Sequence, residues 1–120
     1  MAEINTKIDY DKEEDILDLS RGKSSKASIE IGDFIIDIDF DGFVAGIEIL
    51  NASENLDIPK DFLEKITEAS MSVLYKQSYL KISLGLILQN KEKEILIPLS
   101  VNLGHNQVQT EDTAFVREAK

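Results

Sequence analysis

The chain has 120 residues, a net charge of −10 and no cysteine. This length suits one domain with a hydrophobic core, and the lack of cysteine excludes disulfide bonds and thiolate chemistry. An acidic chain is a poor ligand for nucleic acid or an anionic membrane, and no apolar run approaches a membrane span. Because the first residues also lack the pattern of a signal peptide, we expect a cytoplasmic protein.

The negative charge is concentrated in the first half of the chain. Residues 1–57 hold fifteen Asp and Glu against five Lys and Arg, whereas residues 58–120 hold eight of each. Such an uneven distribution gives one side of a small domain a negative field. It would suit a basic protein as the partner, and the alternative is an acidic surface that only keeps a small protein soluble.

Short runs of alternating apolar and polar residues open the chain. Residues 4–10 and 15–20 predict two strands, separated by a charged turn at 11–14. A small polar loop is expected at 21–26, and residues 28–31 predict a third strand. The period of two is typical of strands that bury one face.

Residues 37–48 match the calcium-loop pattern D-x-D-x-D-G-x5-E. A calcium loop of this type lies between two helices, but the flanking residues here alternate as strands do. Asp41 and Gly42 stand between the two runs, and Asp-Gly in that position predicts a two-residue hairpin turn. We therefore assign Asp41 and Gly42 a structural role.

The two-residue turn also predicts the register of this hairpin. It places the acidic side chains Asp37, Asp39 and Glu48 on one face. On the other face it forms four apolar pairs, which are Phe40 with Phe43, Ile38 with Ala45, Ile36 with Ile47, and Phe34 with Ile49.

The acidic face of the hairpin has two interpretations. Ligands spread along a strand cannot all close on one calcium ion, so a solvated acidic face is favoured. The alternative is a divalent-cation site formed by Asp37, Asp39 and Glu48, with Asp9 or Asp11 beside them.

The second half begins with a predicted helix over residues 57–67. Pro59 suits the first turn of a helix, and Asp61 favours a helix beginning. Three apolar side chains nearby indicate that the helix packs on a sheet. We expect this single short helix to link the two halves.

Residues 68–101 predict a second antiparallel unit. A turn at Gln77 and Ser78 pairs two apolar runs, and residues 95–101 form the last strand. Pro98 lacks a backbone N–H, so this strand is expected at the edge of the sheet. An apolar edge strand can pair with a second copy, which predicts a homodimer.

Residues 102–120 are polar and are expected to form a partly disordered tail outside the single β-rich domain of residues 1–101. A terminal helix through Ala114, Phe115 and Val116 is the alternative. His105 lies in this tail and is expected to be an exposed residue without a catalytic role.

Catalysis has few candidates in this sequence. There is one histidine, no cysteine, and no glycine-rich phosphate loop or nucleophile motif. Carboxylates could act as acid and base only if burial raised the pKa of one of them. We therefore expect no enzymatic activity and no cofactor. Carboxylate-based hydrolysis ranks last of three hypotheses for the function.

Two segments resemble a known family. Residues 8–17 read IDYDKEEDIL and residues 44–53 read VAGIEILNAS. They resemble the opening and the V-x-G-I-E-I-L-x-A-S ending of the prokaryotic family called domain of unknown function 2283. The resemblance covers residues 7–56. It implies a small antiparallel β domain, with the Asp-rich hairpin as a folding feature. The family has no established activity, and some members resemble the small acidic partners in toxin–antitoxin pairs.

Together these observations predict a mainly β protein, an antiparallel sandwich or partly open barrel of about eight strands with one short α-helix. Our first hypothesis for function is a non-enzymatic interaction module that forms a homodimer and offers its acidic half to a basic protein. The alternative is a β domain that binds a divalent cation on the acidic hairpin face.

Overall fold

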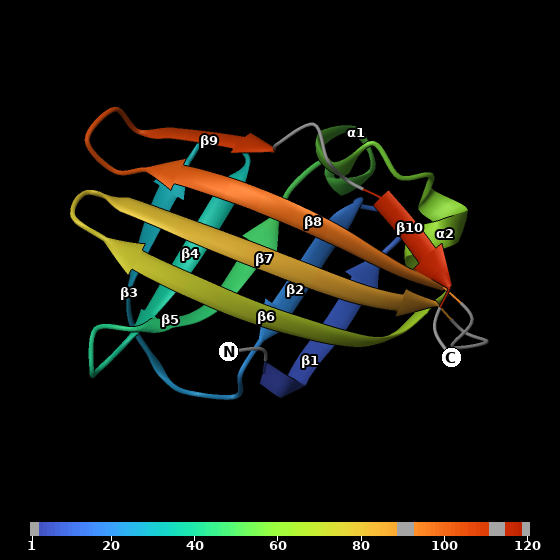
Figure 1. Cartoon of the computed structure of the whole chain (residues 1–120), viewed down its shortest axis with the longest axis horizontal. Helices are drawn as coiled ribbons and strands as arrows, with labels where there is room; N and C mark the ends of the chain where they lie inside the picture. Colours follow the sequence, from blue (N-terminus) through green and yellow to red (C-terminus); the bar gives the residue numbers. More distant parts are fainter. Residues whose placement is uncertain (1–2, 89–92, 111–114, 119–120) are drawn as a thin grey trace.

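The computed structural model describes residues 3–88, 93–110 and 115–118, which form ten antiparallel strands and two helices. One sheet contains all of the strands, in the order β10-β8-β7-β6-β1-β2-β5-β4-β3, and β9 also pairs with β8 (Figure 1). The strands are β1 (Glu3–Asp11), β2 (Ile16–Ser20), β3 (Ser25–Ile31), β4 (Phe34–Asp39), β5 (Val44–Ile49), β6 (Ile66–Lys76), β7 (Tyr79–Leu88), β8 (Lys93–Asn102), β9 (Gln107–Thr110) and β10 (Phe115–Glu118).

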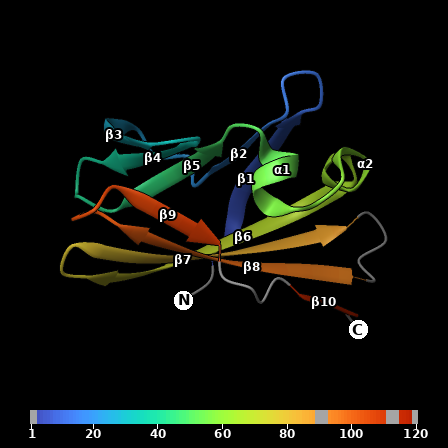
Figure 2. The ribbon, with the colours of Figure 1, turned by 90° about the horizontal axis from the view of Figure 1, so that it is seen from above.

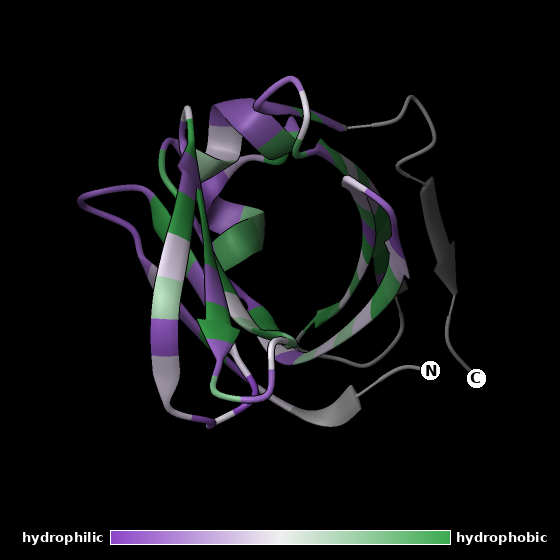
Figure 3. Ribbon diagram, turned by 90° about the vertical axis from the view of Figure 1, so that its left-hand side faces the viewer, coloured by the Kyte–Doolittle hydropathy of each residue, from purple (hydrophilic) through white to green (hydrophobic). Residues whose placement is uncertain are grey.

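The sheet curls until its two ends face each other without pairing. Seen end-on, the strands form an incomplete ring (Figure 3). From above, β1–β5 lie in one layer and β6–β8 in the other (Figure 2). The predicted mainly β fold, a sandwich or partly open barrel, is confirmed.

One hydrophobic core lies between the two layers. Its largest fully buried side chains come from both halves of the chain, namely Leu17, Leu19, Ile36, Ile47, Ile49, Leu63, Met71, Ile82, Leu84, Leu86, Ile97 and Leu99. These side chains belong to a single cluster, so each half covers the apolar face of the other.

The helical segment differs from the single helix predicted over residues 57–67. It contains two short helices, α1 (Ala52–Leu56) and α2 (Lys60–Glu64), that lie at one end of the barrel (Figure 2). Asp57 adopts a left-handed conformation with φ 55° and ends α1, and Pro59 precedes α2. Of the helices in the described residues, none combines the length and the apolar content that crossing a bilayer requires.

The second hairpin has the predicted register. Tyr75 faces Leu80 across β6 and β7, and the pairs Val73–Ile82 and Met71–Leu84 follow. The regular alternation of apolar residues therefore predicted the register of this hairpin correctly.

The predicted edge strand is not an edge. β8 pairs with β7 on one side, and on the other with β9 over Leu99–Asn102 and with β10 over Lys93–Leu96. Pro98 stands in the interval between these two pairings, where its missing N–H removes no hydrogen bond to β9 or β10. Among the described residues, the sheet ends at β3 on one side and at β9 and β10 on the other.

The polar tail predicted over residues 102–120 contributes these two extra strands. Gln107–Thr110 forms β9 and Phe115–Glu118 forms β10, so the helix suggested through Phe115 is wrong. Residues 111–114 and 119–120 lie outside the described part of the chain, and the prediction of disorder there stays a prediction.

Candidate functional site

The loop of the β4–β5 hairpin differs from the predicted two-residue turn. The Asp39 N–H donates to the Phe43 carbonyl at 2.8 Å, and the Gly42 N–H donates to the Asp39 carbonyl at 3.1 Å. Gly42 has φ 89°, a conformation that glycine adopts without steric cost. The loop therefore contains three residues, 40–42, and has glycine in the left-handed position.

A β-bulge then restores the predicted pairing farther from the loop. Ile38 pairs with Val44, whereas the prediction paired it with Ala45. The register shifts by one residue beyond this pair, so the predicted pairs Ile36–Ile47 and Phe34–Ile49 are confirmed.

The three-residue loop changes the environment of two aromatic side chains. Phe40 and Phe43 were predicted to pair on the core-facing side of the hairpin. They are 70% and 53% exposed instead.

Asp39, a candidate ligand of the alternative cation site, is hydrogen-bonded within the loop. Its side chain is only 6% exposed. Its Oδ1 accepts the backbone N–H of Asp41 at 2.8 Å and that of Phe43 at 3.0 Å. Because these amides occupy Oδ1, Asp39 fixes the shape of the loop.

The acidic side chains on the outer face of the sheet come from four strands. Asp9 of β1 lies directly opposite Asp18 of β2, and Asp18 lies directly opposite Glu48 of β5. Glu48 pairs with Ile35 of β4, so Asp37, two residues along, is its diagonal neighbour. We call these four carboxylates, Asp9, Asp18, Glu48 and Asp37, the acidic row.

The electrostatics of the acidic row are unfavourable. Burial raises the pKa of the Asp18 carboxyl, and the charges of Asp37 and Asp9 raise it further. Burial likewise raises the pKa of Glu48, with added repulsion from Asp18 and Asp37. The groups that act on these two carboxyls are all acidic, so the row holds its negative charge at a cost to stability.

The predicted cation site does not form as a cluster. Asp37 accepts a hydrogen bond from the Ser28 hydroxyl at 2.6 Å, and Asp39 is turned into the loop. Asp11 accepts the Glu14 backbone N–H and belongs to the β1–β2 turn. Among the described residues, no three His, Cys, Asp or Glu side chains are grouped so that they could hold a metal ion.

A second polar cluster was not predicted from the sequence. Asp15, which is buried and has φ 58°, accepts the Tyr10 hydroxyl at 2.7 Å on Oδ1. Its Oδ2 accepts the Ser53 hydroxyl at 2.7 Å, and its carboxylate also accepts the Ser53 N–H. The Asp15 carbonyl accepts the Ala52 N–H at 2.9 Å. This Tyr10–Asp15–Ser53 network ties the β1–β2 turn to the beginning of α1.

Comparison with known proteins locates this network within a family. Residues 7–53 match the family described as "Protein of unknown function (DUF2283)". An uncharacterized protein of Methanocaldococcus jannaschii is 35% identical over 95 residues, which cover 78% of this chain and 82% of that protein. The chain belongs to this family. No solved structure gives a significant match.

The DUF2283 segment explains why the network escaped prediction. Tyr10 and Asp15 lie in its opening, and Ala52 and Ser53 end it. These residues lie in the two segments that resemble the family, but their contact depends on a fold that brings the two ends of the DUF2283 segment together. The alignment with the M. jannaschii protein is longer than the DUF2283 segment, so that protein resembles this chain outside the segment as well.

The protonation states of the network suit a structural role. Burial raises the pKa of Asp15, but the hydrogen bonds from Tyr10 and Ser53 and the charge of Lys60 outweigh it, so that the pKa is lowered overall. Burial and the bond to Asp15 raise the pKa of Tyr10. An ionised Asp15 that already accepts these hydrogen bonds is a weak base, so Ser53 gains no activation as a nucleophile.

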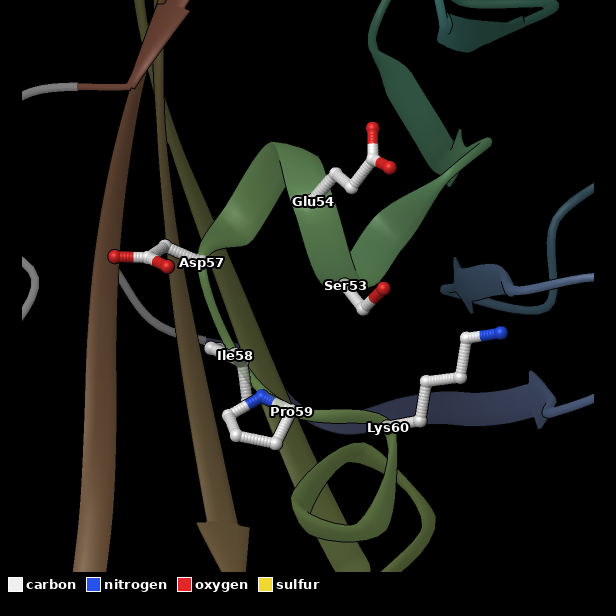
Figure 4. Close-up of a pocket in the computed structure, with 6 residues that line it drawn as sticks. All are labelled: Ser53, Glu54, Asp57, Ile58, Pro59 and Lys60. Carbon is white, nitrogen blue, oxygen red and sulfur yellow. The ribbon is translucent and has the colours of Figure 1, made fainter.

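Ser53 also borders a shallow hollow of about 330 Å³ between the two helices (Figure 4). Its remaining lining residues are Glu54, Asp57, Ile58, Pro59 and Lys60. The Ser53 hydroxyl donates to Asp15, and the charged side chains that line this hollow are those of Glu54, Asp57 and Lys60.

Proposed function

We propose that this protein is a non-enzymatic protein-binding module that presents its acidic row to a basic partner protein. The observation that carries the proposal is the direct alignment of Asp9, Asp18 and Glu48 across three neighbouring strands. The fold does not need this alignment, because the hydrophobic core lies on the other side of the sheet.

The energetics of the row support a cationic partner. Like charges directly opposite each other on a sheet destabilise it, and the raised pKa values of Asp18 and Glu48 reflect first their burial and then this repulsion. Lysine or arginine side chains placed over the row would relieve the repulsion in the complex. They would also accelerate the encounter between the two proteins.

The non-enzymatic part of the proposal rests on the remaining chemistry. His105 is exposed in the turn between β8 and β9, and the Ser53 hydroxyl is engaged by Asp15. The family resemblance implies one such role, in which the module binds a basic toxin as an antitoxin does. Self-association stays a prediction, but it has to use a surface other than β8, which has neighbours on both sides.

The test compares two variants as baits in a lysate of the native host. One variant neutralises the acidic row through Asp9→Asn, Asp18→Asn, Asp37→Asn and Glu48→Gln. The matched control neutralises four exposed carboxylates elsewhere, through Glu13→Gln, Glu14→Gln, Glu54→Gln and Asp57→Asn.

The proposal expects a basic protein that the wild type and the control both retain and the row variant loses. Recovery of only the chain itself, or equal capture by the two variants, would overturn it. Because both variants have the same net charge, a difference between them reports the position of the charge.

A further inference from the structure

Three exposed aromatic side chains lie in segments at one end of the barrel. Phe40 and Phe43 are in the β4–β5 loop region, and Tyr75 is near the end of β6. Their exposed fractions are 70%, 53% and 41%, respectively. Both segments lie at the left-hand end of Figure 1. We call these three residues the rim patch.

Two members of the rim patch, Phe43 and Tyr75, are held in place by specific contacts. The rings of Phe43 and Tyr75 meet edge to face, with centroids 5.6 Å apart and planes at 72°. The Tyr75 hydroxyl accepts the Val44 N–H at 2.9 Å, and Asp39 accepts two amides of the loop. An aromatic surface that is ordered before binding loses less entropy when a partner arrives.

The rim patch adjoins the acidic row along the same hairpin. Phe40 follows Asp37 by three residues, which is about 10 Å of extended chain. On the other strand, Glu48 is five residues from Phe43, or about 17 Å. One extended segment of a partner can therefore span both surfaces.

We propose that the rim patch binds an apolar side chain of a basic protein segment whose cationic side chains lie over the acidic row. This inference rests on the proposed function and adds the second element that the partner must carry. The charge of the acidic row favours a basic protein over a second copy of the chain as the partner. A second copy of the chain has the same net charge of −10, and its acidic half opposes approach to the row.

The acidic row and the rim patch would contribute to binding in different ways. Contacts between exposed opposite charges speed association but add little affinity in physiological salt. Aromatic side chains that become fully buried dominate the affinity of most interfaces. The rim patch supplies such side chains next to the charges.

The test uses two synthetic peptides of equal length and equal lysine content. The anchored peptide ends in leucine and tryptophan, and the unanchored peptide has glycine and serine at those positions. Each is titrated into the ¹⁵N-labelled full chain, and the backbone amide shifts are followed at low and at physiological salt.

We expect both peptides to shift the amides of Asp18 and Glu48, and the anchored peptide alone to shift those of Phe43 and Tyr75. The anchored peptide should bind about tenfold more tightly and lose less affinity with added salt. Phe40→Ser should remove most of that advantage. The control Phe62→Ser, which changes an aromatic residue that is 47% exposed on α2, should leave it intact.

Two failures can be told apart. If both peptides bind equally and the rim amides do not shift, the rim patch is not an anchor, while the proposed function stands. If neither peptide shifts the acidic row, the proposed function itself fails. If Phe62→Ser weakens the anchored peptide as much as Phe40→Ser does, the affinity comes from general apolar contact, which overturns the inference.

Discussion

The two halves of the sheet are built in different ways. In the second half, β6 and β7 pair without interruption from Glu68–Ile87 to Lys76–Tyr79, and their one register shift lies at the far end of the pair, between Ile66 and Glu68. In the first half, the register shifts within the β3–β4 pair and again within the β4–β5 pair. The first half also contains the buried carboxylates Asp15 and Asp39, each of which accepts backbone hydrogen bonds.

This difference shows that apolar alternation forms one half of the sheet, whereas specific side-chain contacts are needed in the other. Alternation of apolar residues is enough to form the long second hairpin, because every pair can take the same geometry. The first half deviates from that geometry at several points, and specific side chains stabilise each deviation. The acidic row lies on this first half, and so do Phe40 and Phe43 of the rim patch.

The halves are nevertheless joined by contacts beyond the core. The Arg21 guanidinium donates to the Met71 carbonyl at 2.8 Å and to the Val44 carbonyl at 3.3 Å. The Tyr75 hydroxyl accepts the Val44 N–H. These contacts hold β5 against β6 where the sheet order does not pair them.

Alanine at the two buried glycines should show the contrast most strongly. A Cβ on Gly46 would lie 2.6 Å from the Leu19 carbonyl oxygen and 3.3 Å from Ser20 Cα, both of them backbone. A Cβ on Gly85 would meet the Ser70 hydroxyl at 2.5 Å, which can rotate away. We expect Gly46→Ala to lower the free energy of unfolding by about 3 kcal/mol and Gly85→Ala by about 1 kcal/mol.

Urea unfolding of the purified variants measures both values. Gly104→Ala is the control, because its nearest neighbour would be the Asn102 side chain at an ordinary 3.5 Å. Equal losses at Gly46 and Gly85 would contradict the view that the first half is the more tightly constrained one.

Asp15→Asn should be the next largest effect. Asparagine tolerates the left-handed backbone at this position, but it replaces one acceptor oxygen with a donor that faces Ser53. We expect a loss of about 2 kcal/mol at neutral pH, measured by urea unfolding. Glu13→Gln, an exposed change in the same turn, should have almost no effect.

The pH dependence gives a second check on Asp15. Its pKa is lowered in the folded protein, so its contribution to stability is present above the unfolded pKa. That contribution is lost as the pH falls through the folded value. The gap between wild type and Asp15→Asn should therefore narrow in acid. A gap independent of pH would mean that the charge of Asp15 is not what stabilises the network.

In the first half, the sequence predicted the outer strand pairs of the β4–β5 hairpin but not its loop. The pairs Ile36–Ile47 and Phe34–Ile49 were predictable because a slip by one residue would expose all of these apolar side chains. The loop was not, because a three-residue loop followed by a bulge leads to the same outer register as a two-residue turn. The environments of Phe40 and Phe43 depend on that choice.

The acidic row and the Asp15 network needed the fold itself. Asp9 and Glu48 were each predicted to lie near the acidic face. Asp18 joins them because β2 pairs with β5, a long-range pairing that alternation does not specify. Asp15 and Ser53 are separated by 38 positions in the chain, and the only signal was their common membership in the family pattern.

Relief of charge in the acidic row should stabilise the protein. Asp18 has a like charge directly opposite on each side, so Asp18→Asn should raise the free energy of unfolding by about 0.5 kcal/mol at pH 7. Differential scanning calorimetry should then show a Tm higher by about 2 °C. Glu54→Gln, on α1 away from the row, should leave the Tm unchanged.

The sign of the pH effect distinguishes this relief from improved packing. The pKa of Asp18 is raised in the folded state, so its penalty is full above the folded pKa. The penalty disappears as the pH falls through the folded value to the unfolded one. The advantage of Asp18→Asn should therefore vanish in acid, and an advantage that persists there would contradict charge repulsion as its cause.

The smallest expected effect is that of divalent cations. A ligand that binds only the folded state raises its stability, by about 2.7 kcal/mol at a hundred times its Kd. Because Asp39 is turned into its loop and Asp37 accepts the Ser28 hydroxyl, we expect millimolar calcium or magnesium to change the Tm no more than sodium chloride of equal ionic strength. Chelator-treated protein provides the baseline. A saturable rise in Tm that Glu48→Gln abolishes would instead make the acidic row a cation site, and the first half would then differ from the second by a bound metal and not by a protein partner.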